Sequence, residues 1–179
     1  RDHSELSLDD GRTYLIPHDT YQGLADLSRW WRGKFSSQIK MVGITGSNGK
    51  TTVKEMVAKI LRCEVGVDKV LATQGNLNNG IGVPKTILEL TSNHKYAVVE
   101  MGMNKVGELR NLTHIVCPDV AIITNIGTAH IGELGSQDAI AAAKSEIICG
   151  LPKGGVLIVE AQGNYTDYLI SQHRGGVAI

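Results

Sequence analysis

The chain has 179 residues, and its 18 lysines and arginines balance its 18 aspartates and glutamates. That length supports one core-forming domain and part of a second, while the balanced charge gives no overall field favouring nucleic acid or a membrane surface. No apolar run approaches the roughly 20 residues that span a bilayer, and the N-terminus lacks the form of a signal peptide. We therefore expect a cytoplasmic protein that neither inserts into membranes nor binds nucleic acid.

Three cysteines, Cys63, Cys117 and Cys149, lie far apart and form no C-x-x-C pair. An odd number of widely spaced cysteines is typical of reduced thiols. We therefore interpret them as core residues rather than as disulfides or metal ligands.

The first 35 residues contain one clear helix pattern. Residues 1–19 have a turn pattern at 9–11 and a short strand pattern at 13–16, and nothing in them builds a core. The helix is predicted from Thr20 to Phe35, with an apolar side formed by Leu24, Leu27, Trp30 and Trp31. The tryptophan pair fits two uses, a stacking platform for a base or sugar and packing against a neighbouring sheet, and we favour packing.

The next stretch is predicted to be a strand at 41–44, a glycine loop and a helix from 50 to 62. The loop reads Thr-Gly-Ser-Asn-Gly-Lys-Thr-Thr, and apolar residues then recur at helical spacing, at Val53, Met56, Val57, Ile60 and Leu61.

This loop is predicted to bind phosphate groups. Gly46 and Gly49 allow positive φ, so backbone N–H groups can approach an anion at the helix N-terminus. Lys50 adds positive charge for β- and γ-phosphates, and the Thr51 hydroxyl suits Mg²⁺. The usual G-x-x-x-x-G-K-[ST] pattern has glycine where this chain has Ile44, so the loop is a shorter variant. The alternative, a glycine-rich turn before an ordinary helix, rarely produces Gly-Lys-Thr at this junction.

From residue 41 onward, strand and helix patterns alternate. Continuous apolar runs predict strands at 41–44, 69–72, 96–99, 120–123 and 156–159, and helical spacing predicts helices at 50–62, 83–90, 106–114, 137–148 and 165–173. Pro84 suits a first helical turn, and Ser136 suits an N-cap. The predicted fold class is α/β, a mainly parallel sheet covered by helices on both faces.

In such a sheet, the loops after the strands meet at one edge, where ligands bind. Glu100 follows a buried strand at this edge, where its carboxylate suits Mg²⁺; the alternative is a cap for a neighbouring helix. An isolated histidine is more often structural, but His130 lies in the Gly- and Asn-containing loop at 124–130 of the same edge, which favours a functional role.

Two further groups at this edge have weaker signals. Asn76, Asn78 and Asn79 stand in a glycine-flanked loop that suits either substrate contact or ordinary turns. Lys144, by pattern alone, is an ordinary exposed helix lysine.

Together these segments resemble the central domain of the Mur ligases, the ATP-dependent amide-forming enzymes of peptidoglycan precursor synthesis. The resemblance covers roughly residues 20–160 and rests on the loop at 45–52, Glu100, Asn125-Ile126-Gly127 with His130, and Ala143-Lys144-Ser145-Glu146. Within the family, Gly75-Asn76-Leu77-Asn78-Asn79-x-Ile81-Gly82-Val83-Pro84 is similar to the branch that adds D-alanyl-D-alanine to UDP-N-acetylmuramoyl-tripeptide.

The resemblance implies a role for each candidate residue. Asn76 and the loop would bind ATP, the loop residues being Thr45, Gly46, Ser47, Asn48, Gly49, Lys50, Thr51 and Thr52. One Mg²⁺ would be held by Thr51 and Glu100, and a second by His130 and a carbamylated Lys144. Catalysis would depend on Lys50, Asn76, His130 and Lys144, and substrate binding on Asn78 and Asn79. The γ-phosphoryl of ATP would pass to a substrate carboxylate, and the amine would attack the acyl phosphate.

The resemblance also implies an incomplete enzyme. Residues 1–35 resemble the end of an N-terminal UDP-sugar-recognition domain with its linker helix, residues 36–179 resemble a truncated central ATP-binding domain, and a C-terminal domain is absent from the sequence. We expect a monomer that cannot ligate alone. Two alternatives are another Mur-type or folylpolyglutamate-type ligase, and a non-catalytic ATP-binding module in which His130 and Lys144 have no role.

Overall fold

The computed structural model describes residues 17–173 and 175–178, so the turn and strand predicted within residues 1–16 lie outside the described residues. The elements are α1 (Thr20–Gly33), β1 (Lys40–Thr45), α2 (Lys50–Val65), η1 (Val67–Lys69), β2 (Val70–Ala72), α3 (Gly82–Leu88), β3 (Tyr96–Glu100), α4 (Glu108–Val116), β4 (Val120–Ile123), α5 (Ile131–Leu134), α6 (Gln137–Ser145), η2 (Glu146–Gly150), β5 (Val156–Val159), α7 (Thr166–Gln172) and β6 (Gly176–Ala178).

The strands form one sheet in the order β2-β3-β1-β4-β5-β6, and all five neighbouring pairs are parallel. The predicted α/β class with a mainly parallel sheet is confirmed. The chain winds to one side of β1 for β2 and β3, then to the other side for β4, β5 and β6. The carboxyl end of β1 therefore lies where the strand order reverses, which is where ligands bind in open sheets of this kind.

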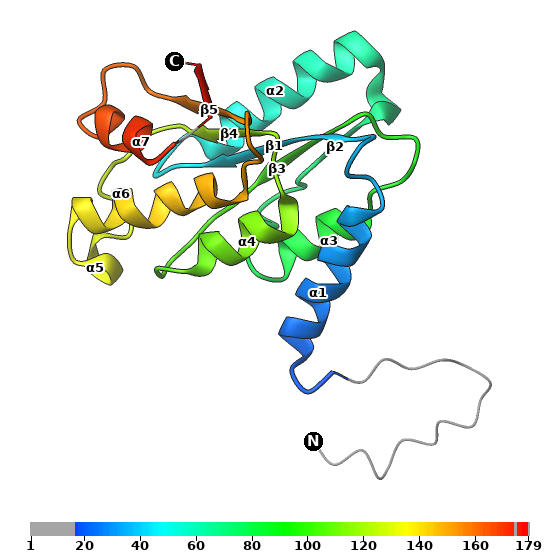
Figure 1. Ribbon diagram of the computed structural model, residues 1–179, viewed down its shortest axis with the longest axis horizontal. Helices are drawn as coiled ribbons and strands as arrows, with labels where there is room; N and C mark the ends of the chain where they lie inside the picture. The colour runs from blue at the N-terminus through cyan, green and yellow to red at the C-terminus, as the bar shows by residue number, and fades with distance from the viewer. Residues whose placement is uncertain (1–16, 174, 179) are drawn as a thin grey trace.

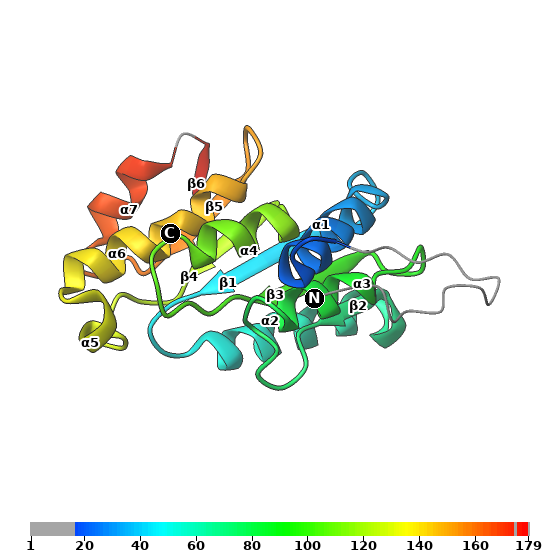
Figure 2. The same cartoon turned by 90° about the horizontal axis from the view of Figure 1, so that it is seen from below.

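Helices cover the two faces of the sheet unequally, as Figures 1 and 2 show. One face packs against α3, α4 and α6 and carries the larger apolar core, with α1 lying outside on α3 and α4. On the other face, α2 packs over β1, β2 and β3 around Ile44, Ala58 and Val98. Side chains from β3 thus enter both cores, with Val98 in one and Val99 in the other. Alternation along the strand explains this division.

The buried side of α1 differs from the predicted one. Leu27 and Trp30 are 39% and 56% exposed, whereas Ser28 and Arg32 are buried. Arg32 Nε donates to the Val116 carbonyl at 3.0 Å, so a polar side chain occupies the position expected for an apolar one. The helix is therefore turned by about one residue position from the predicted orientation.

The two tryptophans have different surroundings. Trp31 donates from its indole nitrogen to the Leu90 carbonyl at 3.0 Å and meets Phe35 edge-on. Trp31 therefore packs as expected rather than forming a stacking platform, but it packs beside α3 and not against the sheet. Trp30 is exposed, and the Lys34 ammonium lies 4.7 Å from its ring centre.

The buried side of α2 is displaced in the same way. Met56 and Ile60 are 59% and 66% exposed, although both were expected on the apolar side. Lys54 and Ala58 are buried instead. This rotation brings a lysine ammonium beneath the end of β2.

Several smaller expectations need correction. Helix α4 begins at Glu108 rather than Val106, because Gly107 takes a left-handed φ of 91° at the N-cap. The short elements α5 and β6 were not predicted. The cysteines are free, as expected, but all three are exposed rather than buried in the core.

Ser136 caps α6 as predicted, accepting from the Ala139 amide at 3.1 Å. Among the described residues, none of the helices is both long and apolar enough to cross a bilayer.

Candidate active site

The loop after β1 has a backbone path that requires glycine. Gly46 has φ 148°, and a Cβ placed there would lie 1.9 Å from the Thr124 hydroxyl. The absence of a side chain therefore lets the loop after β1 touch the loop after β4. Thr45 is buried immediately before it, and its hydroxyl has no hydrogen-bond partner among the described residues. Gly49 takes the left-handed conformation at the N-cap of α2.

The loop after β4 holds this glycine loop in place. Asn125 accepts from the Ser47 amide through its carbonyl at 3.1 Å and from the Asn48 amide through its side chain at 2.9 Å. The Thr124 hydroxyl donates to the Asn48 carbonyl at 2.6 Å. Neither Asn125 nor Thr124 was predicted to give this support, although both stand in the loop at 124–130.

The free amides of the loop lie at its C-terminal end. No hydrogen bond within the described part of the chain uses the N–H groups of Gly49, Lys50, Thr51 and Thr52. These are the first amides of a helix, which carry partial positive charge and commonly bind anions.

Lys50 lies close to the same amides. Its ammonium donates to the Gly46 carbonyl at 2.8 Å and the Ser47 carbonyl at 3.3 Å. Burial lowers the pKa of Lys50 below its ordinary value, and the Glu100 carboxylate partly opposes that lowering. The side chain is thus a half-buried cation held within reach of the helix N-terminus.

Glu100 lies at the centre of a buried hydrogen-bond cluster. It is 2% exposed. One of its carboxylate oxygens accepts from the Thr51 hydroxyl at 2.9 Å, and the other accepts from Asn78 Nδ2 at 2.8 Å. The structure therefore brings together a hydroxyl from the glycine loop, a carboxylate from β3 and an amide from the loop after β2.

The asparagines after β2 differ in their contacts. Asn79 accepts from the Ile81 and Gly82 amides at 3.1 and 2.9 Å, which caps the start of α3. Asn76 is exposed, and its carbonyl accepts from the Asn78 amide at 2.8 Å. A Cβ at Gly82 would lie 2.4 Å from the Leu77 carbonyl carbon, so glycine is needed where this loop folds against α3.

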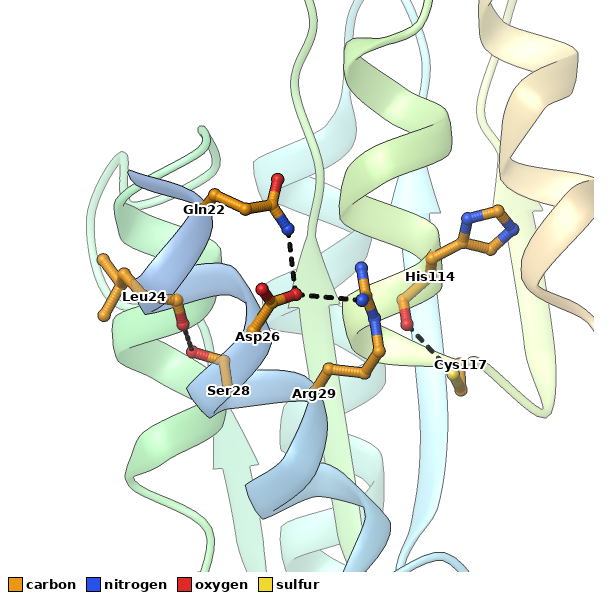
Figure 3. A network of polar contacts seen from close by, with 7 residues as sticks. All are labelled: Gln22, Leu24, Asp26, Ser28, Arg29, His114 and Cys117. Carbon is orange, nitrogen blue, oxygen red and sulfur yellow. Dashed lines mark hydrogen bonds and ion pairs between the residues drawn. The ribbon is translucent and has the colours of Figure 1, made fainter. Parts of the chain in front are cut away.

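His130 stands at the N-cap of α5 with a left-handed φ of 70°. It lines a pocket of about 430 Å³ whose other lining residues include Lys50, Asn78 and Asn79. The pocket extends to α1, from which Gln22 and Arg29 are among the lining residues. Figure 3 shows these two side chains on α1, where the Asp26 carboxylate accepts from Gln22 at 2.8 Å and from Arg29 at 3.1 Å.

Lys144 is buried rather than exposed, with an accessible fraction of 1%. Neither a hydrogen bond nor an ion pair reaches its ammonium from any residue that the structure describes. Burial, with a smaller contribution from the charge of Lys50, lowers the pKa of Lys144 to about 8. A buried cation without a partner is unusual, because desolvation of a charge is costly.

Glu146 is the buried charge that follows Lys144 two residues later. Its carboxylate accepts from the Gly107 amide at 2.8 Å and from the Arg110 amide at 3.0 Å. It therefore caps the N-terminus of α4 from a neighbouring segment. Glu146 belongs to one of the segments that carry the family resemblance, but no role was predicted for it.

The residues present fit a magnesium ion at one place in this site. Thr51 and Glu100 supply the hard oxygen donors that Mg²⁺ prefers, beside the amides that suit phosphate. Across the described ranges, no group of three His, Cys, Asp or Glu side chains is placed to hold a metal. A metal here would need oxygens from a bound nucleotide or water to complete its coordination, which is usual for Mg²⁺.

Comparison with known proteins agrees with this geometry. The family model described as the Mur ligase middle domain matches residues 44–176. The UDP-N-acetylmuramoyl-tripeptide–D-alanyl-D-alanine ligase of Haemophilus influenzae is 45% identical over 154 residues, which is 86% of this chain and 33% of the relative.

Two solved structures are also similar. A crystal structure of MurF from Acinetobacter baumannii matches with a TM-score of 0.86 and 43% identity, over 91% of this chain and 35% of that one. MurF ligase from Thermotoga maritima in complex with ADP matches with a TM-score of 0.82 and 28% identity, over 96% of this chain and 39% of that one.

The chain spans about a third of the length of the curated relatives that it matches. The family model covers most of the described residues and includes the glycine loop, Glu100, His130 and Lys144. The chain therefore belongs to the Mur ligase family.

Proposed function

We propose that this chain is the ATP-binding part of a ligase that joins D-alanyl-D-alanine to UDP-N-acetylmuramoyl-tripeptide. The name of the Haemophilus relative and its 45% identity support this choice of substrates. The contact between Thr51 and Glu100 beside Lys50 is the observation that carries the proposal. It groups a hydroxyl, a carboxylate and an ammonium where a metal-bound triphosphate needs them.

The reaction would proceed in two steps, phosphoryl transfer and then amide formation. A carboxylate oxygen of the tripeptide attacks the γ-phosphorus of ATP, so an acyl phosphate forms and ADP leaves. The amine of D-alanyl-D-alanine then attacks the acyl carbon, and the tetrahedral intermediate expels phosphate as the amine loses a proton. An amide replaces the carboxylate.

The chain's contribution would be to bind and neutralise the phosphates. The amides of residues 49–52 would donate to phosphate oxygens, and the Lys50 ammonium would leave its loop carbonyls to join them. Thr51 and Glu100 would hold the first Mg²⁺, which when bound neutralises charge on the phosphoryl oxygens. Asn76 would face the nucleotide and the acyl group, while Asn78 and Asn79 would shape the substrate side of the pocket.

Lys144 would enter this site as a carbamate. Its lowered pKa leaves about a tenth of the amine neutral at pH 7. A neutral amine adds to carbon dioxide to give a carbamate and one proton, which converts a cation into an oxygen ligand. With His130, the carbamate would hold the second Mg²⁺. A carbon-13 carbamate signal in labelled bicarbonate, absent from Lys144→Met, is the expected observation; its absence from the parent chain would contradict this assignment.

The remaining assignments follow from the family. Residues 1–35 would end a UDP-sugar-recognition domain and supply its linker helix, and residues 36–179 would belong to the ATP-binding domain. The amine-presenting domain would be a further part of the full-length ligase. A monomer working in the cytoplasm, with no ligation by these 179 residues alone, stays our prediction.

Phosphate release by the full-length ligase tests the function. The assay contains Mg-ATP, UDP-N-acetylmuramoyl-tripeptide and D-alanyl-D-alanine, with each omitted in turn as a control. We expect release only when all three are present. Turnover on a different acid and amine would keep the ligase chemistry and overturn these substrates. Nucleotide binding without turnover on any pair would favour the non-catalytic module instead.

A further inference from the structure

Lys54 is a buried charge that the reaction described above does not use. It lies on α2 three residues after Thr51 and is 1% exposed. Lysine is almost never fully buried unless its ammonium is paired, because the charge must leave water. The contacts of the Lys54 ammonium therefore indicate the role of this buried charge.

The Lys54 ammonium is directed toward the end of β2. It donates to the Thr73 carbonyl at 2.7 Å and pairs with the Glu55 carboxylate at 2.6 Å. Glu55 is itself 60% exposed, so the contact with Thr73 is the buried one. Lys54 does not line the pocket that contains Lys50, and a role in binding phosphate does not fit its position.

Thr73 links this lysine to the proposed metal site. Its hydroxyl accepts from the Glu100 amide at 2.9 Å, and its own amide donates to the Val98 carbonyl at 3.0 Å. Thr73 thus joins β2 to β3 where Glu100 leaves the strand. Its carbonyl is the group that Lys54 holds.

Glu100 is then positioned from both of its ends. Its backbone is held by Thr73, and its carboxylate is held by Thr51 and Asn78. Since Thr51 and Lys54 are both on α2, one helix supplies the hydroxyl beside the carboxylate and the cation that holds Thr73, the residue bonded to the Glu100 backbone. We propose that Lys54 is a positioning residue that keeps Glu100 in place for Mg-nucleotide binding.

This inference rests on the proposed function, because it requires a Mg-nucleotide at Thr51 and Glu100. A purely structural role for Lys54 would support α2 without any specific effect on metal binding. The two roles differ in what happens to nucleotide binding when Mg²⁺ is removed. Measurements with and without the metal therefore separate them.

The experiment is titration of the 179-residue chain with ADP by calorimetry, in Mg²⁺ and in chelator. The variants are Lys54→Met, Lys54→Arg and Thr73→Val, with Lys59→Met as the control because Lys59 is exposed on the same helix. We expect Lys54→Met to lose about tenfold or more of the Mg²⁺-dependent gain in affinity, as outer contacts to metal ligands commonly do. Affinity in chelator should stay unchanged, Lys54→Arg should restore most of the gain, and Lys59→Met should match the parent.

Thr73→Val removes the acceptor of the Glu100 amide without touching the lysine, and we expect it to lose the same gain. Thr73→Val replaces Lys54→Met as the test variant if circular dichroism shows that Lys54→Met does not fold. An unchanged Mg²⁺-dependent gain in ADP affinity in Lys54→Met would overturn the inference and leave the proposed function standing. The same result in Thr73→Val would do so if only that variant folds. Equal losses with and without Mg²⁺ would also overturn it, in favour of a structural role. No Mg²⁺ effect in the parent chain would overturn the proposed function and the inference with it.

Discussion

Two lysines, equally buried on opposite faces of the sheet, have opposite surroundings. Lys54, on α2, is 1% exposed and donates to a backbone carbonyl and a carboxylate. Lys144, on α6, is also 1% exposed, yet no described residue offers its ammonium a partner. Figures 1 and 2 show the two helices on the two sides of the strands.

The difference indicates which buried ammonium has its hydrogen-bonding partners within this chain. Lys54 has its partners, so its charge strengthens the attachment of α2 to β2. Lys144 lies near a second cation, Lys50, which makes its charged form still less favourable. A residue that destabilises the fold in this way is typical of a functional site. The five predictions below test this difference between the two lysines and their neighbouring charges, beginning with the largest expected effect.

Lys144→Met is expected to stabilise the 179-residue chain. The pKa of Lys144 falls from an ordinary 10.5 to about 8 in the folded chain, which is worth on the order of 3 kcal/mol. Methionine has similar size and no charge to desolvate. Urea unfolding at pH 7 in CO₂-free buffer, which keeps the parent lysine unmodified, measures the gain. A loss of stability would show that the ammonium has a favourable partner.

The same gain should depend on pH in a defined direction. Because the folded pKa is the lower one, the unfolded chain binds more protons between about 8 and 10.5. The penalty in the parent is complete below about pH 8 and fades as pH rises toward 10.5. The difference between Lys144→Met and the parent should therefore shrink across that window. A constant difference would point to packing rather than charge.

Lys54→Met should have the opposite sign at pH 7, with a loss of about 2 kcal/mol. The Thr73 carbonyl would be left without its buried donor. The same urea titration measures the loss, and Lys59→Met on the exposed side of α2 should fall within about 0.5 kcal/mol of the parent. Equal effects at Lys54 and Lys59 would remove the distinction between a paired buried lysine and a surface one.

Prediction from the sequence succeeded best for the strands and for the loops that follow them. The strand at 120–123 and the strand at 156–159 were predicted with the bounds that the structure has. Along both strands buried residues alternate with half-buried ones, and continuous apolar runs of this length are typical of strands in a parallel sheet. The loops that follow the strands then had to meet at one edge, which brought Thr51 beside Glu100.

The helices show why the rest was out of reach. On α2, the prediction counted Met56 and Ile60 toward the buried side because both are apolar, whereas Lys54 lies there instead. On α1, Arg32 likewise displaced Trp30. Each buried cation reaches particular backbone carbonyls, that of Thr73 for Lys54 and those of Val116 and Cys117 for Arg32. Periodicity scores hydrophobicity alone, and these carbonyls come from segments distant in the sequence, so no local pattern contains them.

Glu146→Gln compares Lys144 with the other buried charge of its segment. The carboxylate accepts from the amides of Gly107 and Arg110, so it is satisfied in the way that Lys54 is. Glutamine keeps one acceptor and loses the negative charge at the N-terminus of α4, which should cost about 1 kcal/mol. Thermal unfolding of the 179-residue chain measures the loss. A gain like that of Lys144→Met would mean that this carboxylate is also strained.

Glu55→Gln should have the smallest effect and refines the account of Lys54. Glu55 pairs with Lys54 at 2.6 Å, and this hydrogen bond lowers the pKa of its carboxyl. The carboxyl is nevertheless 60% exposed, and water screens a pair of that kind to about 0.5 kcal/mol or less. Urea unfolding at pH 7 should place Glu55→Gln within that margin, whereas Lys54→Met loses several times more. If the two variants lost equal stability, the ion pair with Glu55 would be what holds Lys54, and the buried contact with Thr73 would contribute little.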